Sequence, residues 1–244
     1  MCDTFPQGML DDISDFLSAE ASRATNLDVY DEVFERPLMF PLQRKNELAA
    51  MIRCVRPYNP HTVMEIGTDK GGGLYHWCKC LPTVNRVSAC EIRGTPYSTL
   101  FEQAFPHIGF LWLPFSSYDP KSVGIVRSWL GDTTIDCLFI DGDKSAFLLD
   151  FDAYLPLMSD NSVVFMHDIQ IEQPRTAFET LRARGYRVSI LIDTTEARES
   201  LELAMRGGPL RSAHDQWLRY WGEASAGVGI IYLGSVRQSA KEVP

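Results

Sequence analysis

The segment Glu65-Ile66-Gly67-Thr68-Asp69-Lys70-Gly71-Gly72-Gly73 joins a short apolar run, residues 62–66, to an apolar, helix-like run at residues 74–81. The first run predicts a strand and the second a helix. Glycines between a strand and a helix let backbone N–H groups approach a ligand closely. Four glycines within seven residues at this turn favour a ligand-binding loop over a tight turn without a ligand.

The same alternation of strand and helix signals continues outward from this loop. Strands are expected at residues 86–91, 108–113, 135–140, 162–166, 186–192 and 227–233, and helices at residues 9–21, 42–56, 96–105, 120–130, 146–157 and 174–184. Such alternation predicts a parallel sheet with helices on both faces. The near-continuous apolar character of residues 135–140 fits a strand buried on both faces. The expected fold class is therefore α/β, a doubly wound Rossmann-like sheet of seven strands.

The expected organisation is one domain over residues 58–236, preceded by an N-terminal helical extension over residues 1–57. Residues 193–222 form a long connection between the last two strands. Loops of this length are usually functional or partly helical. We interpret this one as either a substrate-side lid or a dimer contact.

The composition excludes several classes of protein. The 244 residues carry a net charge of −9, which argues against broad binding to nucleic acid, because phosphate backbones require a basic face. No apolar run reaches the ~18 residues of a membrane-spanning helix, and the N-terminus lacks a signal-peptide pattern. The six cysteines form no C-x-x-C pair. A cytoplasmic protein with free thiols and no membrane partner is expected.

The glycine loop by itself does not choose its ligand. The motif typical of a dinucleotide-binding site is G-x-G-x-x-G, whereas the spacing from Gly67 is G-x-x-x-G. The second expected strand ends in Glu91, and an acidic side chain there can accept both hydroxyls of a ribose. This arrangement suits any cofactor that contains adenosine.

Two motifs carry a resemblance to a known family. Residues 65–73 resemble motif I of the class I S-adenosylmethionine (SAM)-dependent methyltransferases. Phe139-Ile140-Asp141-Gly142-Asp143-Lys144 resembles the strand-four motif of the cation-dependent O-methyltransferases, such as the caffeoyl-CoA and catechol enzymes. The longer segment 139–152, with residues 163–169, is similar to a bacterial branch that includes the cephalosporin-biosynthesis methyltransferase-like protein and the macrolide-sugar O-methyltransferases. The resemblance covers about residues 35–234 and implies a mostly parallel sheet whose last strand is antiparallel.

The resemblance implies that SAM is the cofactor. Glu91 would hold the ribose hydroxyls, with Ile92 beside the adenine. Ser116 stands where many relatives have an aspartate, which makes that adenine contact weaker here. The residues implied to bind the cofactor are Glu65, Gly67, Thr68, Gly71, Gly72, Gly73, Glu91, Ile92, Ser116, Ser117 and Asp141.

A divalent-cation site is expected at Asp141, His167 and Asp168, because these residues end neighbouring strands near the switch point of the sheet. Mg²⁺ prefers oxygen ligands, and the imidazole could move the preference toward Mn²⁺, Fe²⁺ or Zn²⁺. Two alternatives stay open. His167 could be a general base without a metal, or Asp141 could bond backbone amides while His167 and Asp168 cap the next element.

Lys144 stands where the cation-dependent relatives carry a lysine that deprotonates the acceptor hydroxyl. It could do so only with a lowered pKa, and the alternative is a surface lysine paired with Asp143. The expected function is O-methylation of a small-molecule hydroxyl in bacterial secondary metabolism, by a homodimer. The catalytic residues would be Lys144 and His167. The alternatives are a protein that binds SAM without methyl transfer or acts as a partner subunit, a nicotinamide-dependent oxidoreductase, and a nucleic-acid methyltransferase.

Overall fold

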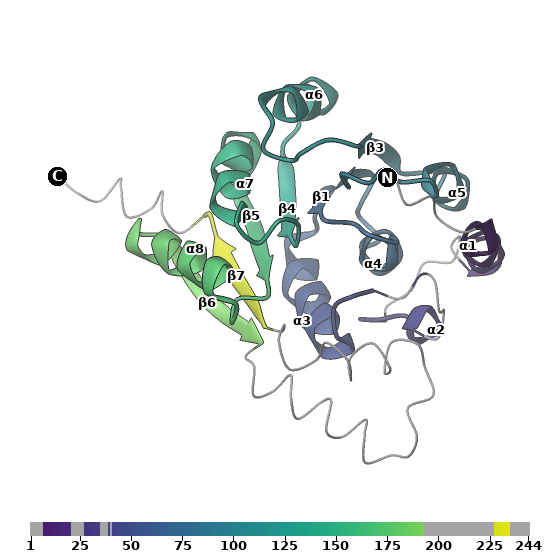
Figure 1. Ribbon diagram of the computed structural model, residues 1–244, viewed down its shortest axis with the longest axis horizontal. Coiled ribbons are helices and arrows are strands. Elements are labelled where there is room, and N and C mark those ends of the chain that lie inside the picture. The colour runs from purple at the N-terminus through teal and green to yellow at the C-terminus, as the bar shows by residue number, and fades with distance from the viewer. Residues whose placement is uncertain (1–6, 21–26, 35–38, 40, 193–226, 235–244) are drawn as a thin grey trace, which may run out of the picture.

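One seven-stranded sheet with helices on both faces makes up the computed structural model, which describes residues 7–20, 27–34, 39, 41–192 and 227–234 (Figure 1). The expected long connection at residues 193–222 lies outside the described residues. The helices are α1 (Gln7–Glu20), α2 (Asp31–Phe34), α3 (Lys45–Val55), α4 (Gly72–Cys80), α5 (Ser98–Ala104), α6 (Pro120–Leu130), α7 (Phe147–Tyr154) and α8 (Glu172–Ala183), with 3-10 turns η1 (Arg56–Tyr58) and η2 (Leu155–Leu157). The strands are β1 (Thr62–Ile66), β2 (Arg86–Cys90), β3 (Gly109–Leu113), β4 (Ile135–Ile140), β5 (Met158–His167), β6 (Arg187–Ile192) and β7 (Val228–Tyr232).

The strand order in the sheet is β3-β2-β1-β4-β5-β7-β6. Strands β1 to β5 pair in parallel, and β7 pairs antiparallel to both β5 and β6. The chain reverses its direction of winding between β1 and β4, so the carboxyl ends of these two strands flank the switch point. Ligands of doubly wound sheets bind in the crevice at that point.

The alternation of side chains along each strand divides the core into two layers. Within β1, Val63 joins the layer beneath α1 to α5, whereas Met64 joins the layer beneath α6, α7 and α8. Figure 1 shows these two groups of helices on opposite sides of the sheet. Val63 and Met64 are both fully buried, one in each layer. Burial of apolar side chains in each layer stabilises the fold. It also determines the register of the strands, because a shift by one residue would move these side chains to the other face of the sheet.

The expected fold class is confirmed, including the antiparallel last strand. The strand expected at 162–166 is longer in the structure, because β5 begins at Met158, which pairs with Ile135 before a register shift. The short helix α2 had no separate signal in the sequence. Among the described residues, no helix has both the length and the apolar character needed to cross a membrane.

Candidate functional site

A cavity of about 540 Å³ opens at the carboxyl ends of the strands. This volume is within the usual range of small-molecule sites. Loops after β1, β2, β3, β4 and β5 line it, and residues 41–43, just before α3, close one side. The N-terminal part of the chain therefore contributes to the same cavity as the sheet.

The glycine loop after β1 contains two glycines with positive φ. Gly67 has φ +86°, and a Cβ there would lie 2.5 Å from the carbonyl oxygen of Asp141. Gly71 has φ +85° and begins helix α4 as its N-cap. Both positions require glycine, because other residues are strained at positive φ and the added atom at Gly67 would strike backbone.

Alanine at Gly67 is expected to destabilise the fold by about 2 kcal/mol or more, because positive φ and overpacking both cost free energy. Alanine at Gly124, an exposed position inside α6 with open space around it, is expected to stabilise by up to about 1 kcal/mol. Chemical denaturation of both variants measures the difference. Equal stability of the two would contradict the tight backbone contact at Gly67.

The carboxyl group of Glu65 lies beneath this loop. A Cβ on Gly73 would lie 2.6 Å from Glu65 Oε1, so glycine at this position leaves room for the carboxyl group. Burial raises the pKa of Glu65 well above its ordinary value, and the charges of Asp141 and Glu91 raise it further. This favours a neutral carboxyl, which can donate as well as accept a hydrogen bond.

Glu91 follows β2 and is almost fully buried. Its Oε2 accepts from the Asp69 backbone N–H at 2.9 Å, and its Oε1 accepts from the backbone N–H and the Nε of Arg93 at 3.1 and 3.0 Å. Each carboxylate oxygen can accept more than one hydrogen bond. The carboxylate is thus held rigidly beside the glycine loop and retains capacity for ribose hydroxyls. Next to it, Ile92 is 71% exposed and provides an apolar surface at the cavity.

The loop after β3 brings Ser116 and Ser117 to the cavity wall. The Ser117 hydroxyl donates to Asp150 Oδ1 of α7 at 2.5 Å, and the Tyr154 hydroxyl donates to the Ser117 carbonyl at 2.6 Å. Because the single hydroxyl proton of Ser117 is used on Asp150, its oxygen is left to accept from a ligand. An exocyclic amine such as that of adenine fits this requirement.

Burial raises the pKa of Asp150 to about 7, and the hydrogen bond from Ser117 offsets only part of that rise. The native state then binds more protons than the unfolded chain between about pH 4 and pH 7, so stability falls as the pH rises through this window. Asp150→Asn removes this titration but keeps an acceptor for Ser117. We expect its stability relative to wild type to improve by about 2 kcal/mol or more between pH 4 and pH 8. Thermal unfolding of both proteins at both pH values measures this change, and a pH-independent difference in stability would contradict it.

At the ends of β4 and β5, the structure brings Asp141, His167 and Asp168 together, and one ligand atom from each lies within 4.8 Å of the others. His167 Nδ1 lies 3.2 Å from Asp141 Oδ1 and 3.3 Å from Asp168 Oδ1. Asp168 has φ +56°, a conformation that aspartate and asparagine tolerate better than most residues. The three residues expected to bind a cation thus converge on one point.

Lys144 is paired with the same carboxylates. Its Nζ makes an ion pair with Asp141 and lies 2.8 Å from Asp168 Oδ2. The alternative pairing with Asp143 is therefore not what the structure shows. Burial would lower the pKa of Lys144, but Asp141 and Asp168 outweigh burial and raise it. In this arrangement the lysine is an ammonium and not a base, whereas the base role requires a lowered pKa.

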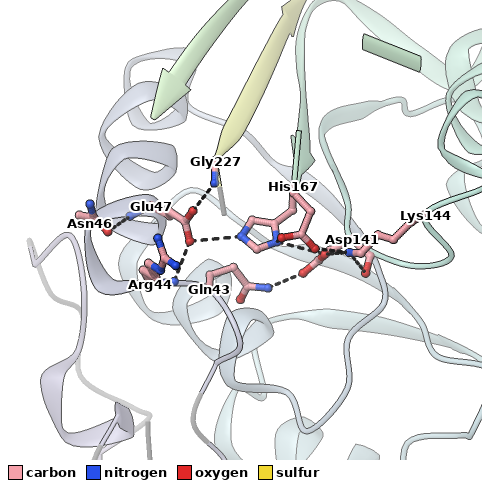
Figure 2. Close-up of polar contacts among 9 residues, drawn as sticks. Gln43, Arg44, Asn46, Glu47, Asp141, Lys144, His167 and Gly227 are labelled. Carbon is pink, nitrogen blue, oxygen red and sulfur yellow. Dashed lines mark hydrogen bonds and ion pairs between the residues drawn. The ribbon is translucent and has the colours of Figure 1, made fainter. Parts of the chain in front are cut away.

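Two residues of this cluster had not been expected from the sequence. Gln43 donates from Nε2 to Asp141 Oδ2 at 2.6 Å, and Glu47 Oε2 lies 3.2 Å from His167 Nε2 (Figure 2). A signal for Glu47 does exist, because it lies four residues before buried Met51 on the apolar side of α3. A charged residue inside an apolar stripe indicates a buried partner.

The donor set fits a divalent cation. Two carboxylates and an imidazole suit Mn²⁺, Fe²⁺ or Zn²⁺. Histidines that ligate metals usually donate their other N–H to a carboxylate or a carbonyl, and His167 has Glu47 in that place. The three carboxylates of Glu47, Asp141 and Asp168 exceed the two cationic groups of Lys144 and His167 by one negative charge. A cation between Asp141 and Asp168 would replace the ammonium of Lys144.

Most residues expected at the site line the cavity. The lining set is Glu65, Gly67, Thr68, Gly72, Gly73, Glu91, Ile92, Ser116, Ser117, Asp141, Lys144, His167 and Asp168. Gly71 does not line it and instead packs against the rings of Tyr97 and Phe101. Its part is to start α4 rather than to contact a ligand.

Comparison with known proteins agrees with this geometry. Residues 64–169 match the family model described as a methyltransferase domain. An O-methyltransferase from Bacillus cereus, solved in complex with S-adenosylhomocysteine (SAH), is similar in structure, with a TM-score of 0.52 and 11% identity over 94% of this chain and 93% of that one. A candidate caffeoyl-CoA O-methyltransferase from Staphylococcus aureus has a TM-score of 0.51 and 14% identity over 79% and 85% of the two chains. No curated protein matches the chain in sequence.

The family model matches part of the chain, and the solved structures show its fold. The chain has the class I methyltransferase fold, and the matched segment runs from β1 through the end of β5, the part that carries the glycine loop, Glu91 and the acidic cluster. The resemblance read from the two motifs is confirmed at this level.

Proposed function

We propose that this protein is a SAM-dependent methyltransferase that methylates a hydroxyl group of a small molecule with the assistance of a divalent cation. The observation that supports this most is that one cavity joins two different sites. The glycine loop and Glu91 lie at the ends of β1 and β2, where a nucleoside cofactor would bind. The charged cluster lies at the ends of β4 and β5, where an acceptor would meet the methyl group.

The reaction requires little beyond positioning. The acceptor oxygen attacks the methyl carbon of SAM, the bond from sulfur to carbon breaks with its electron pair staying on sulfur, and the hydroxyl proton leaves to a base. Asp141, His167 and Asp168 would hold the cation. When bound, the cation would supply Lewis acidity that favours the deprotonated acceptor.

We assign the contact with the acceptor oxygen to Lys144, because its side chain is 30% exposed, whereas that of His167 is 6% exposed. Lys144 can accept a proton only after it has separated from Asp141 and Asp168 and given up a proton to solvent, since their charges hold its pKa above the ordinary value. While paired, it would instead stabilise a negatively charged acceptor oxygen. His167 would then serve as a ligand.

The experiment incubates the purified protein with SAM and a panel of catechols, hydroxycinnamates and sugars, after chelator treatment and again with added Mn²⁺ or Mg²⁺. Formation of SAH together with an O-methylated product, increased by the cation, is the expected result. SAH binding without any product would overturn the transferase proposal and leave a cofactor-binding protein. Equal rates of product formation after chelator treatment and with added cation would overturn only the role of the cation and leave the transferase proposal in place.

A further inference from the structure

Glu47 connects three parts of the chain that are distant in sequence. Its Oε2 accepts from the backbone N–H of Arg44 at 2.9 Å and lies 3.2 Å from Nε2 of His167, 120 residues away. Its Oε1 accepts from the backbone N–H of Gly227 at 2.7 Å, 180 residues away. Figure 2 shows the carboxylate between these partners. A helix cap needs only the bond to Arg44, so the other two contacts require a further explanation.

Two of the three partners, the backbone N–H groups of Arg44 and Gly227, can only donate to the carboxylate. Glu47 is 1% exposed, and each of its two oxygens accepts a hydrogen bond from a backbone N–H, an environment that favours the ionised carboxylate. An ionised carboxylate only accepts hydrogen bonds, so the contact with His167 requires a proton on Nε2.

That requirement determines which ring nitrogen faces the cluster. With Nε2 turned to Glu47, Nδ1 is directed at Asp141 and Asp168. While no cation is bound, Nδ1 also carries a proton that faces the carboxylates of Asp141 and Asp168. A bound cation would displace this proton and take the electron pair of Nδ1, while the proton on Nε2 stays on Glu47. The orientation of His167 and its available nitrogen thus follow from one contact.

We propose that Glu47 is a positioning residue that holds His167 with its Nε2 proton on the carboxylate, so that Nδ1 is the atom offered to a cation between Asp141 and Asp168. This inference rests on the proposed function for the identity of the site. It adds the ligating atom and a residue from the N-terminal helix α3 to that site.

The contact with Gly227 extends the same control to the last strand. Gly227 has φ +90° and precedes β7, whose residue Val228 pairs with His167 in the sheet. Glu47 therefore binds the side chain of His167 and also the chain entering its neighbouring strand. Both contacts limit the movement of His167 relative to Asp141 and Asp168.

The sharpest variant is Glu47→Gln. An amide has one acceptor oxygen and an NH₂ group that only donates, so it cannot satisfy donors on both sides of the side chain. In the variant, the NH₂ group takes the place of one of the two oxygens. It then faces either the N–H of Gly227 or the N–H of Arg44 together with Nε2 of His167. Asp136→Asn is the matched control. Asp136 also accepts from two backbone N–H groups, those of His61 and Thr62, but both bonds go to a single oxygen, which an asparagine can keep. The residue lies at the opposite end of the sheet.

The first readout is the imidazole ¹⁵N spectrum of histidine-labelled, metal-free protein, assigned with His167→Gln. His76 provides an internal reference of opposite type, because its Nε2 accepts from the Tyr30 N–H and its Nδ1 faces the Gly72 carbonyl. We expect His167 to carry a proton on Nε2 in the wild type, and this signal to shift in Glu47→Gln but not in Asp136→Asn. An unprotonated Nε2 in the wild type, or an unchanged spectrum in Glu47→Gln, would overturn the proposal; the wild-type arm does not depend on how the variant folds.

The second readout is calorimetric affinity for Mn²⁺. We expect Glu47→Gln to weaken Mn²⁺ binding by about tenfold or more, as removal of the outer partner of a ligating histidine does, with SAH affinity within about twofold of wild type. Wild-type affinity for Mn²⁺ in Glu47→Gln would overturn the positioning role. Failure of the wild type to bind Mn²⁺ would instead overturn the cation in the proposed function, while the ¹⁵N spectra would still decide what Glu47 does to His167.

Discussion

Glu91→Ala is expected to weaken SAH binding by about tenfold to a hundredfold, because hydrogen bonds to a charged group contribute about 1.5–3 kcal/mol each. The buried carboxylate is already positioned by the Asp69 N–H and by Arg93. The ribose would therefore bind to a side chain that is already ordered, so little conformational entropy is lost on binding. Removal of the side chain also frees the Asp69 N–H from its acceptor, which loosens the glycine loop.

The matched control for this variant is Glu102→Ala. Glu102 is exposed and accepts a hydrogen bond from the Trp112 indole at 2.8 Å, so the change deletes a carboxylate near the neighbouring strand β3. Its SAH affinity is expected to stay within about twofold of wild type. Calorimetric titration with SAH measures both variants. If Glu91→Ala bound SAH with wild-type affinity, the proposed contact between Glu91 and the ribose would be contradicted.

Asp168→Asn is expected to lower the cation-assisted rate of methyl transfer by about a hundredfold or more, because it removes one of the three groups that would hold the cation, and a barrier increase of about 2.7 kcal/mol corresponds to a hundredfold in rate. The change removes a negative charge that faces both Lys144 Nζ, at 2.8 Å, and His167. Asparagine keeps the shape of the side chain and tolerates the positive φ of this position. The loss would thus report charge rather than backbone strain.

SAH affinity of Asp168→Asn is expected to remain within about threefold of wild type, because Asp168 follows β5, whereas Glu91 follows β2. Asp132→Asn, in the exposed turn after α6, is the control for removal of one acidic charge. Single-turnover transfer from SAM to an accepted hydroxyl compound gives the rate, and calorimetry gives the affinity. Full activity would remove Asp168 from the reaction, and loss of activity and affinity together would indicate a structural role.

The elements of the fold could be predicted because strong local signals encode them. The apolar run of β4 and the glycine loop are features of neighbouring residues, and both lie where the sequence places them. The glycines could be recognised as a ligand loop, but the sequence could not show why Gly73 is needed. Its reason is the carboxyl group of Glu65, which lies against it only in the folded chain.

The charged cluster could be predicted only in part. Asp141, His167 and Asp168 could be placed together because parallel strands end at one edge of a sheet. Glu47 could not, because it reaches His167 through packing of α3 on the sheet, a contact across 120 residues. The protonation of Lys144 also depends on distance. A nearby cation would lower the pKa of this lysine, whereas Asp141 and Asp168 raise it.

Binding of SAH to the wild-type protein, measured by calorimetry after chelator treatment and again with Mn²⁺, decides whether this cavity is a cofactor site. We expect SAH to bind with a Kd in the micromolar range, about 1–100 µM, with a separate heat for Mn²⁺. The absence of any SAH binding heat under both conditions, in protein shown to be folded, would contradict a SAM-dependent function for this fold.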